Sequence, residues 1–272
     1  MPDYAALLPM VLLLLVIGGF AGVIAGLLGV GGGIVLVPAF YFTFTHLGYD
    51  SAQIMQVCVA TSLATIVFTS IRSVMAHNRK GAVDWSVLKS WAPWIVVGAI
   101  GGMLVAAQVD STALLYVFGV LGLVVGVYML LGRQDWRLGT GMPTGAPRGI
   151  MAMVVGFLSV LMGIGGGTFG VPLMTLYSQP IHRAVATASG FGIMIAAPSV
   201  LGFLFLPIEG APPYTLGAVN TPAFLIVMAT TMTTTTWGVK LAHAMDPKPL
   251  KRVFGAFLIL VALNMLRKAA GW

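Results

Sequence analysis

The chain has 272 residues, of which 58% are hydrophobic and only 8% are charged, and its mean hydropathy is +0.99. Soluble domains carry about 25% charged residues, so this composition excludes an ordinary soluble protein. Apolar stretches of about 20 residues, long enough to cross a hydrocarbon core of about 30 Å, run between short charged loops. Backbone groups in lipid need internal partners, and a β-barrel would alternate in segments of about 10 residues, so we expect an all-α, polytopic membrane protein.

The formal net charge of the chain is +7. An anionic partner is one explanation, but membrane proteins collect Lys and Arg in cytoplasmic loops, and this second explanation is the stronger one. Cys58, the one cysteine, lies in an apolar segment, where it can form no internal disulfide and is not by itself a metal site. We expect it to be a small packing residue.

Ten apolar segments follow one another along the chain, from which we expect about 8–10 membrane helices. They span residues 7–28, 34–48, 53–73, 91–109, 112–132, 149–162, 168–181, 184–206, 217–238 and 250–268. The first is expected to be a retained helix rather than a secretory signal, because no Lys or Arg precedes it. The longest polar break, 133–148, is rich in Gly, Pro and Arg. We interpret it as a cytoplasmic linker between a first membrane repeat, 1–132, and a second, 149–272.

The two halves contain the same motifs in the same order. Residues 29–33 (Gly-Val-Gly-Gly-Gly), followed by Val37-Pro38, recur as residues 163–167 (Gly-Ile-Gly-Gly-Gly), followed by Val171-Pro172. Val59-Ala60-Thr61-Ser62 recurs as Val185-Ala186-Thr187-Ala188, and Val117-Phe118-Gly119 recurs as Val253-Phe254-Gly255. One glycine-rich match would be weak, since glycine is common in membrane helices. Three matches in register predict an internal duplication.

The Lys and Arg positions indicate that the halves are inverted. With five crossings per half and both termini outside, all but two of the 14 Lys and Arg residues are cytoplasmic, as the positive-inside rule favours. The cytoplasmic set is Arg72, Arg79, Lys80, Lys89, Arg133, Arg137, Arg148, Arg183, Lys240, Lys248, Lys251 and Arg252, and Arg267 and Lys268 fall outside. If the glycine segments added no crossing, Arg183, Lys240, Lys248, Lys251 and Arg252 would be exported instead. An odd number of segments per half gives inverted repeats, a layout of secondary transporters.

The glycine triplets are predicted to be the tips of helical hairpins. The stretch 149–181 is too short for two full crossings, because each arm reaches only about 20 Å at about 1.5 Å per residue. Gly165-Gly166-Gly167 would then be a tip that stops within the membrane. The inverted relation makes Gly31-Gly32-Gly33 a tip that enters from the opposite side.

Glycine tips of this kind suit anion binding. They permit positive φ and close approach of a ligand, and the helix after each tip begins with unpaired N–H groups and a partial positive charge. Such a site needs no buried Lys or Arg. Close helix packing would explain a single glycine motif, but two inverted copies favour a binding site. Pro38 and Pro172 are predicted hinges, which free a carbonyl or kink the helix.

Hydroxyl groups are further candidates to line the site. Thr61, Ser62, Thr187 and Ser189 can donate hydrogen bonds to anionic oxygens. Bonds back to a carbonyl of the preceding turn are an equally good explanation for Ser and Thr in membrane helices. Seven residues, 230–236, contain six threonines in an apolar segment, and only some of these can face a pathway or another helix.

Ionisable groups lie away from the middle of the segments. The acids are Asp3, Asp50, Asp84, Asp110, Asp135, Glu209 and Asp246, all at segment ends or in loops. A proton-coupled carrier often keeps an ionisable group in mid-span, so any coupled proton would be carried by the substrate or by a histidine. We expect His46 and His243 at the interface and His77 in a loop. Either His182 or Arg183 could attract anions to the cytoplasmic mouth, although Arg183 fits the positive-inside rule without that role.

Signatures of enzymes are missing from the sequence. It has no Cys/His metal cluster, no Walker loop and no paired catalytic carboxylates, and no strand or acidic partner accompanies the glycines as a dinucleotide site requires. We therefore expect no catalytic residue, no metal ion and no cofactor. The expected partners are a small anionic substrate and the lipid bilayer, without nucleic acid, and the chain could also form a homodimer.

The paired motif resembles the sulfite exporter TauE/SafE family of bacterial membrane transporters. Both halves carry Gly-x-Gly-Gly-Gly-x-x-x-Val-Pro, the first half has Ala60-Thr61-Ser62 downstream, and residues 77–85 also look like the first-half loop of that family. The resemblance implies a multi-pass transporter of sulfite or organosulfonates in the bacterial inner membrane, commonly an exporter. The resemblance also implies that the glycines and prolines named above, together with Thr61, Ser62 and Thr187, are functional residues. One departure is Ala188, which stands where the family usually has Ser, so Ser189 is the nearest hydroxyl.

The sequence thus predicts a secondary transporter that moves a small anion, an oxidised sulfur species, by alternating access between its two halves. An anion channel that uses the same tips as a filter is the first alternative. A non-transporting membrane scaffold or subunit is the second, and the scarcity of soluble loops argues against it.

Overall fold

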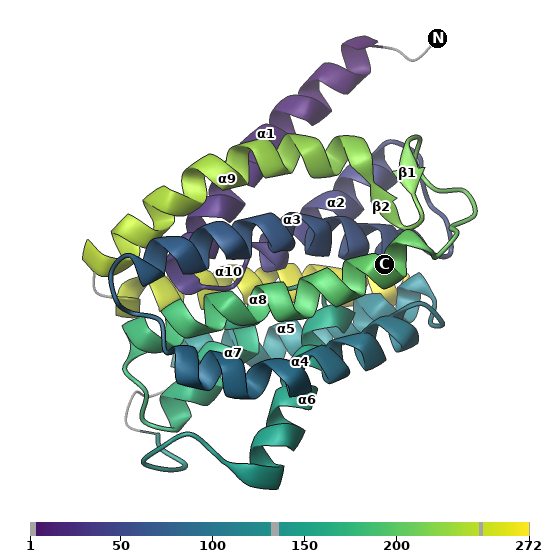
Figure 1. Cartoon of the computed structure of the whole chain (residues 1–272). Coiled ribbons are helices and arrows are strands. Elements are labelled where there is room, and N and C mark those ends of the chain that lie inside the picture. Colours follow the sequence, from purple (N-terminus) through teal and green to yellow (C-terminus); the bar gives the residue numbers. More distant parts are fainter. Residues whose placement is uncertain (1–3, 132–135, 245–246, 272) are drawn as a thin grey trace.

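The computed structural model describes residues 4–131, 136–244 and 247–271. Asp3, Arg133, Asp135 and Asp246, and with them the first three residues of the predicted linker, lie outside the described residues. The described part folds into helices that correspond one to one with the ten predicted segments (Figure 1). They are α1 (Tyr4–Leu28), α2 (Gly33–His46), α3 (Ile54–Asn78), α4 (Trp85–Ala106), α5 (Ser111–Leu131), α6 (Gly145–Leu161), α7 (Gly167–Leu176), α8 (Ile181–Leu204), α9 (Thr221–Ala244) and α10 (Pro247–Ala269).

Within the described residues, five helices, α1, α3, α4, α5 and α8, are long and apolar enough to cross a membrane. Of these, α3 and α8 are the most buried and form the centre of the bundle. Helices α1, α4 and α5 instead expose large apolar side chains such as Val16, Val97 and Val124. Exposed apolar faces on several helices suit contact with lipid rather than with water.

Helix boundaries follow local chemistry. Asp84 caps α4, because its carboxylate accepts hydrogen bonds from the N–H groups of Ser86 (3.1 Å) and Val87 (3.2 Å). Helix α6 begins at Gly145, so residues 145–148 of the predicted linker are helical. Proline is accepted in the first turn of a helix, where its missing N–H has no partner in any case, and Pro147 therefore does not delay α6.

The all-α prediction missed one short feature. Strands β1 (Thr215–Leu216) and β2 (Val219–Asn220) form an antiparallel pair between α8 and α9. The pair turns through Gly217, whose φ is +57°. Two-residue strands are too short to leave a periodic signal in the sequence.

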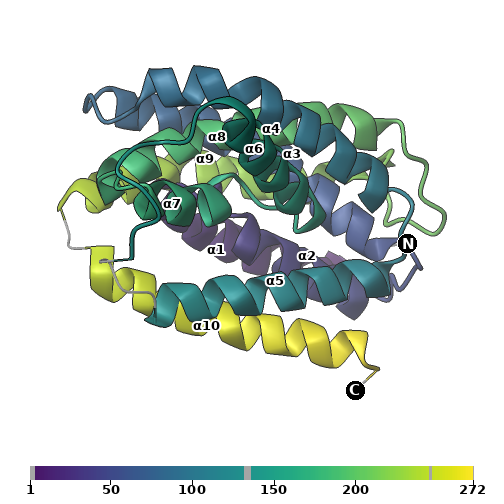
Figure 2. The same ribbon diagram turned by 90° about the horizontal axis from the view of Figure 1, so that it is seen from below.

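Helix packing follows one pattern in both halves. Helix α1 packs along α9 and α4 packs along α6, so the first helix of each half lies against the fourth helix of the other. The third helices, α3 and α8, pack together, as do the fifth helices, α5 and α10, which run side by side in Figure 2. The pattern of neighbours is therefore unchanged when the two halves are exchanged.

Glycines allow these close crossings. On α1, Gly18, Gly22 and Gly26 recur every four residues and face α9. A Cβ atom built on Gly22 would lie 2.7 Å from the Cα of Thr231, and one built on Gly98 of α4 would lie 2.7 Å from the Cα of Met153 of α6. Small residues let membrane helices approach until their backbones touch.

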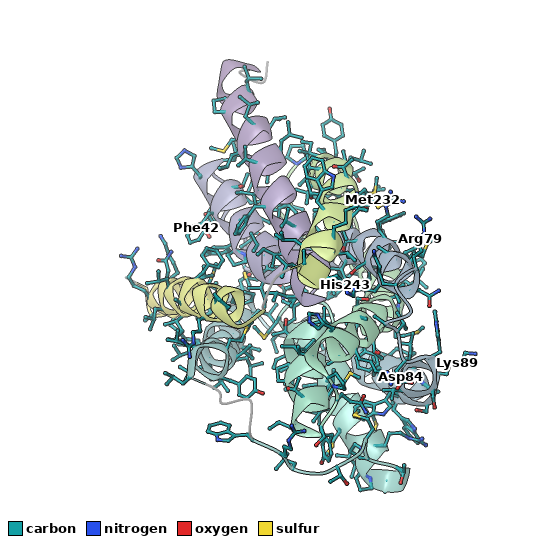
Figure 3. All side chains as sticks on the ribbon, turned by 90° about the vertical axis from the view of Figure 1, so that its left-hand side faces the viewer. Phe42, Arg79, Asp84, Lys89, Met232 and His243 are labelled. Atoms are coloured by element: carbon teal, nitrogen blue, oxygen red, sulfur yellow. The ribbon has the colours of Figure 1, made fainter. Side chains whose placement is uncertain are left out.

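One end of the bundle, called the basic end below, is where α3 and α9 end and α4 and α8 begin. Arg183 at the start of α8 pairs with Asp84 at the start of α4, with 3.2 Å between Nη2 and Oδ2. His77 near the end of α3 meets His243 near the end of α9. Figure 3 views this end and labels Arg79, Asp84, Lys89 and His243. Arg267 and Lys268, by contrast, lie in the last turn of α10 at the opposite end.

Candidate functional site

Each glycine segment connects two helices by a short non-helical turn. The first glycine segment, residues 29–33, runs from the end of α1 to the first residue of α2, and the second, residues 163–167, leads into α7. Gly29, Gly31 and Gly32 have φ of 67°, 75° and 83°, and Gly163 has φ of 63°. These left-handed conformations are open to glycine and strained for most other residues.

The two glycine segments touch through their backbones. The N–H of Gly165 donates a hydrogen bond of 3.1 Å to the carbonyl of Val30. A Cβ atom on Gly33 would clash with the Gly163 carbonyl, and one on Gly167 would clash with the Gly29 carbonyl. The structure therefore brings the two glycine segments together, and at Gly33, Gly165 and Gly167 the backbone of the other segment leaves no room for a side chain.

Helix α3 holds both segments from one side. The hydroxyl of Ser62 donates to the carbonyl of Gly163 (2.8 Å), and the hydroxyl of Thr69 lies 3.3 Å from the carbonyl of Gly31. Both hydroxyls are buried. Ser62 was predicted as a direct ligand of the anion, but its hydroxyl hydrogen is engaged by the neighbouring glycine segment.

Thr61 and Thr187 make matching bonds between the halves. Thr61 accepts a hydrogen bond of 3.0 Å from the N–H of Asn220, just before α9, and Thr187 accepts one of 2.9 Å from the N–H of Asp84, just before α4. Each threonine therefore anchors the start of the fourth helix of the other half. Ser189 donates to the carbonyl of Ala186 (2.7 Å), which is the backbone bond that competes with ligand binding.

The start of α7 contains a polar group that sequence reasoning missed. Thr168, the second residue of α7, is only 2% exposed, and its hydroxyl has no hydrogen-bond partner among the described residues. Pro172, one turn later, lacks an N–H, so the carbonyl of Thr168 also loses its usual helical donor. The first half has Ile34 at the corresponding place.

A cavity of about 40 Å³ lies beside this helix start. Gly167, Thr168 and Pro172 line it from α7, Val30 from the first glycine segment, and Val185 from α8. A single water needs about 10–15 Å³, so the cavity can hold a few waters or a small ion. None of its lining residues is charged, and no side chain caps α7.

The unpaired N–H groups at the start of α7 and the free hydroxyl of Thr168 are all hydrogen-bond donors. The start of a helix also carries a partial positive charge, equivalent to about half an elementary charge. The site can therefore attract and bind an anion without a buried cation. The equivalent start of α2 lacks the hydroxyl, and its backbone also differs, because Gly32 has a φ of 83° where Gly166 has a φ of −64°.

Comparison with known proteins identifies the family. The profile described as Sulfite exporter TauE/SafE matches residues 14–265. The chain belongs to this family. A probable membrane transporter protein of Haemophilus influenzae is 30% identical over 95% of this chain and 98% of its own length. One from the archaeon Methanocaldococcus jannaschii is 27% identical over 97% of both chains. No solved structure matches this chain.

Family membership and the membrane-spanning helices make this TauE/SafE protein a multi-pass membrane transporter. Transporter function requires no catalytic residue. Within the described residues no three His, Cys, Asp or Glu side chains are grouped so that they could hold a metal ion.

The described ionisable residues include one that lies elsewhere than predicted. The described acids, Asp50, Asp84, Asp110 and Glu209, are all at helix ends or in loops. His77, however, was predicted in a loop and instead lies in the last turn of α3, only 1% exposed. Helix α3 continues past residue 73, where the predicted segment ends, to Asn78. Its exposed Arg72 donates from Nε–H to Thr236 at 3.2 Å.

Proposed function

We propose that the protein is a secondary transporter that moves a small anion across the bacterial inner membrane. The substrate class is sulfite, an organosulfonate or a related sulfur oxyanion, and export is the proposed direction. The observation that carries this proposal is the unpartnered hydroxyl of Thr168 beside the uncapped start of α7, in a cavity that adjoins both glycine segments.

The chemistry of the site suits a sulfur oxyanion. Such an ion presents several acceptor oxygens, and the helix start presents N–H groups that only donate and a hydroxyl that can donate. The helix dipole favours the negative charge, and the absence of a buried Lys or Arg among the lining residues keeps binding weak enough for release. A carrier needs this balance because it must let the ion leave on the other side.

The arrangement of the halves supports alternating access. We infer that they are inverted repeats with Gly-tipped hairpins, because exchange of the halves preserves the helix neighbours and each half has five helices. The small cavity is lined near the basic end by Ile181 at the start of α8. A recess of about 560 Å³, lined by Tyr41, Ser111 and Lys268, lies at the opposite end.

The contact between the glycine segments supports a carrier over a channel. The Gly165–Val30 hydrogen bond links the two segments directly beside the cavity, which Val30 also lines. One half rocking on the other, with flexure at Pro38 and Pro172, would transfer access from one end of the bundle to the other.

Sulfite uptake into proteoliposomes tests this function. We expect saturable wild-type flux, and a loss of at least about tenfold in Gly167→Ala, whose new methyl group would clash with Gly29. Gly101→Ala is the matched control, since its Cβ would lie 3.8 Å from the Phe157 ring, an ordinary contact distance. Absence of saturable flux for sulfite, sulfate, thiosulfate and sulfonates alike would overturn the proposal, as would wild-type flux in Gly167→Ala.

A further inference from the structure

Three of the four histidines of the chain gather at the basic end, on three different helices. His77 lies near the end of α3, His243 near the end of α9, and His182 near the start of α8. The rings of His182 and His243 are stacked, with centroids 5.8 Å apart and an angle of 18° between their planes. In Figure 3, His243 lies nearer the middle of this end than the labelled Arg79, Asp84 and Lys89.

The contacts of His77 fix where hydrogens can be. Its Nε2 is 3.1 Å from the carbonyl of Gly26, and because a carbonyl only accepts, Nε2 must carry a hydrogen. Its Nδ1 is 3.2 Å from Nε2 of His243, so one hydrogen lies between the two rings. When both rings are neutral, His243 donates that hydrogen, and its own Nδ1 is left with a free lone pair.

That lone pair can take up a proton without breaking either hydrogen bond. His243 is exposed at the basic end, so water can deliver the proton to it. The uptake forms one N–H bond and gives the pair a single positive charge. Since the ring-to-ring bond can then carry that charge on either ring, the Gly26 bond becomes charge-assisted and about twice as strong.

The groups around the pair act on its charge in both directions, because the Gly26 carbonyl favours a cation whereas burial and the neighbouring cationic groups oppose one. The carbonyl of Gly26 belongs to the last turn of α1, whose partial negative charge stabilises a cation. The other charged or titratable groups that face the pair are His182 from α8 and Lys80 from the loop after α3. Both are cations or can become cations. Asp84 at the same end is already paired with Arg183.

The pair also lies close to the transport machinery. Gly26 is three residues before Gly29, the first residue of the first glycine segment. A Cβ atom on Gly26 would clash with the Thr235 carbonyl of α9, so α1, α3 and α9 meet at this glycine. His182 directly follows Ile181, which lines the cavity at the start of α7.

We propose that the His77–His243 pair is a proton-binding site whose occupancy strengthens anion binding at the start of α7. The inference rests on the proposed function, because it couples a proton to the transported anion. The bound proton adds a positive charge near the cavity and fixes the end of α1 that leads into the first glycine segment. By linkage, anion binding then increases the proton affinity of the pair by the same factor.

The test measures the KM for sulfite in a counterflow assay, with the same pH inside and outside the proteoliposomes. The pH is varied between about 5.5 and 8, the range in which histidine ordinarily titrates. His243→Gln is the main variant, because its amide N–H can still donate to His77 but the side chain cannot take up the proton. The ratio of the variant KM to the wild-type KM at each pH cancels the titration of sulfite itself. His46→Gln, at an exposed histidine in the last turn of α2, is the matched control, and His182→Gln tests the stacked ring.

The proposal predicts that the KM ratio for His243→Gln is about fivefold or more at pH 5.5 and falls toward one at pH 8. The ratio for His46→Gln should stay near one throughout. A His243→Gln ratio that does not change with pH overturns the inference while leaving the transport function intact. Absence of saturable wild-type flux overturns the transport function and the coupling together.

A second measurement does not depend on flux. Nitrogen-15 NMR of histidine-labelled protein should show a hydrogen on Nε2 of His77 at every pH, and uptake of one proton by the pair as the pH is lowered to 5. If both rings stay neutral down to pH 5, the proton-binding site is refuted whatever the transport assays show.

Discussion

At the scale of single residues, the same side-chain chemistry serves two purposes in this protein. The repeat singles out Thr61, Ser62 and Thr187, and in the structure their hydroxyls bind protein backbone. Sequence alone could not decide between ligand and backbone, because both require a hydrogen-bonding group at the same place. Thr168 differs because it has no partner. Alignment of the two halves could have drawn attention to Thr168, because the first half has the apolar Ile34 at the corresponding position.

The first prediction at this scale concerns Thr168. Thr168→Val keeps the shape of the side chain and removes the hydroxyl, so we expect the KM for sulfite to rise by about 10-fold or more, because hydrogen bonds to charged groups contribute about 1.5–3 kcal/mol. Thr168→Ser should retain wild-type KM. Thr175→Val is the control, since Thr175 lines the same cavity but its hydroxyl already donates to the Pro172 carbonyl at 2.8 Å. Equal effects at Thr168 and Thr175 would contradict the assigned role.

The second prediction concerns the bonds between the halves. Thr187→Val removes the acceptor of the Asp84 N–H and should lower the free energy of unfolding by about 1–3 kcal/mol. Ser189→Ala on the same helix loses only a bond within its own helix and should cost less. Thermal unfolding in detergent at fixed lipid content compares the two variants. A larger decrease in the free energy of unfolding for Ser189→Ala than for Thr187→Val would show that the Asp84–Thr187 hydrogen bond contributes little to stability.

At the scale of helices, the sequence is a good guide to number and order and a poorer guide to boundaries. All ten predicted segments are helices in the described chain. Hydropathy does not mark where a helix ends in a polar environment, so α3 and α9 extend past the predicted segments to Asn78 and Ala244. The threonine run of 230–236 is explained by packing: Thr231 and Thr235 are buried and bond to carbonyls four residues earlier.

The α1–α9 crossing gives a prediction at this scale. Gly22→Leu places a side chain where Thr231 backbone lies and should destabilise the protein by about 1–3 kcal/mol or prevent folding. Gly19→Leu, on the same helix, is the matched control, because its Cβ would lie 4.0 Å from the nearest neighbouring atom, in Thr234. Size-exclusion profiles and thermal midpoints in detergent measure both. Equal destabilisation would show that close packing is not specific to the glycine stripe.

At the scale of the whole molecule, the proposed inversion explains why basic side chains gather at one end. Arg79, Lys80, Lys89 and Arg183 are at the ends of helices that meet there, whereas Lys268 is at the opposite end. The order of the motifs predicted the duplication, and the charges predicted its direction. The contact between the two glycine segments could not be predicted in the same way, because it depends on how the halves pack in three dimensions.

Thiol labelling tests the direction of the halves. Single cysteines at Lys80 and Lys240 should react with an impermeant reagent from the cytoplasmic side, and those at Glu209 and Gly271 from the outside, since all four positions are exposed. The wild-type protein is the blank, because Cys58 is fully buried. Labelling of positions 80 and 209 from the same side would exclude the inverted topology.

The central claim is that a small oxyanion binds where the start of α7 meets the two glycine segments. The most direct measurement is the position of a selenium oxyanion, such as selenite, located by its anomalous scattering in crystals of the protein. The account predicts a selenium peak in the cavity, within hydrogen-bonding reach of the Thr168 hydroxyl through its oxygens, and loss of that peak in Thr168→Val. A peak confined to the basic side chains of the surface, with the cavity empty, would contradict it.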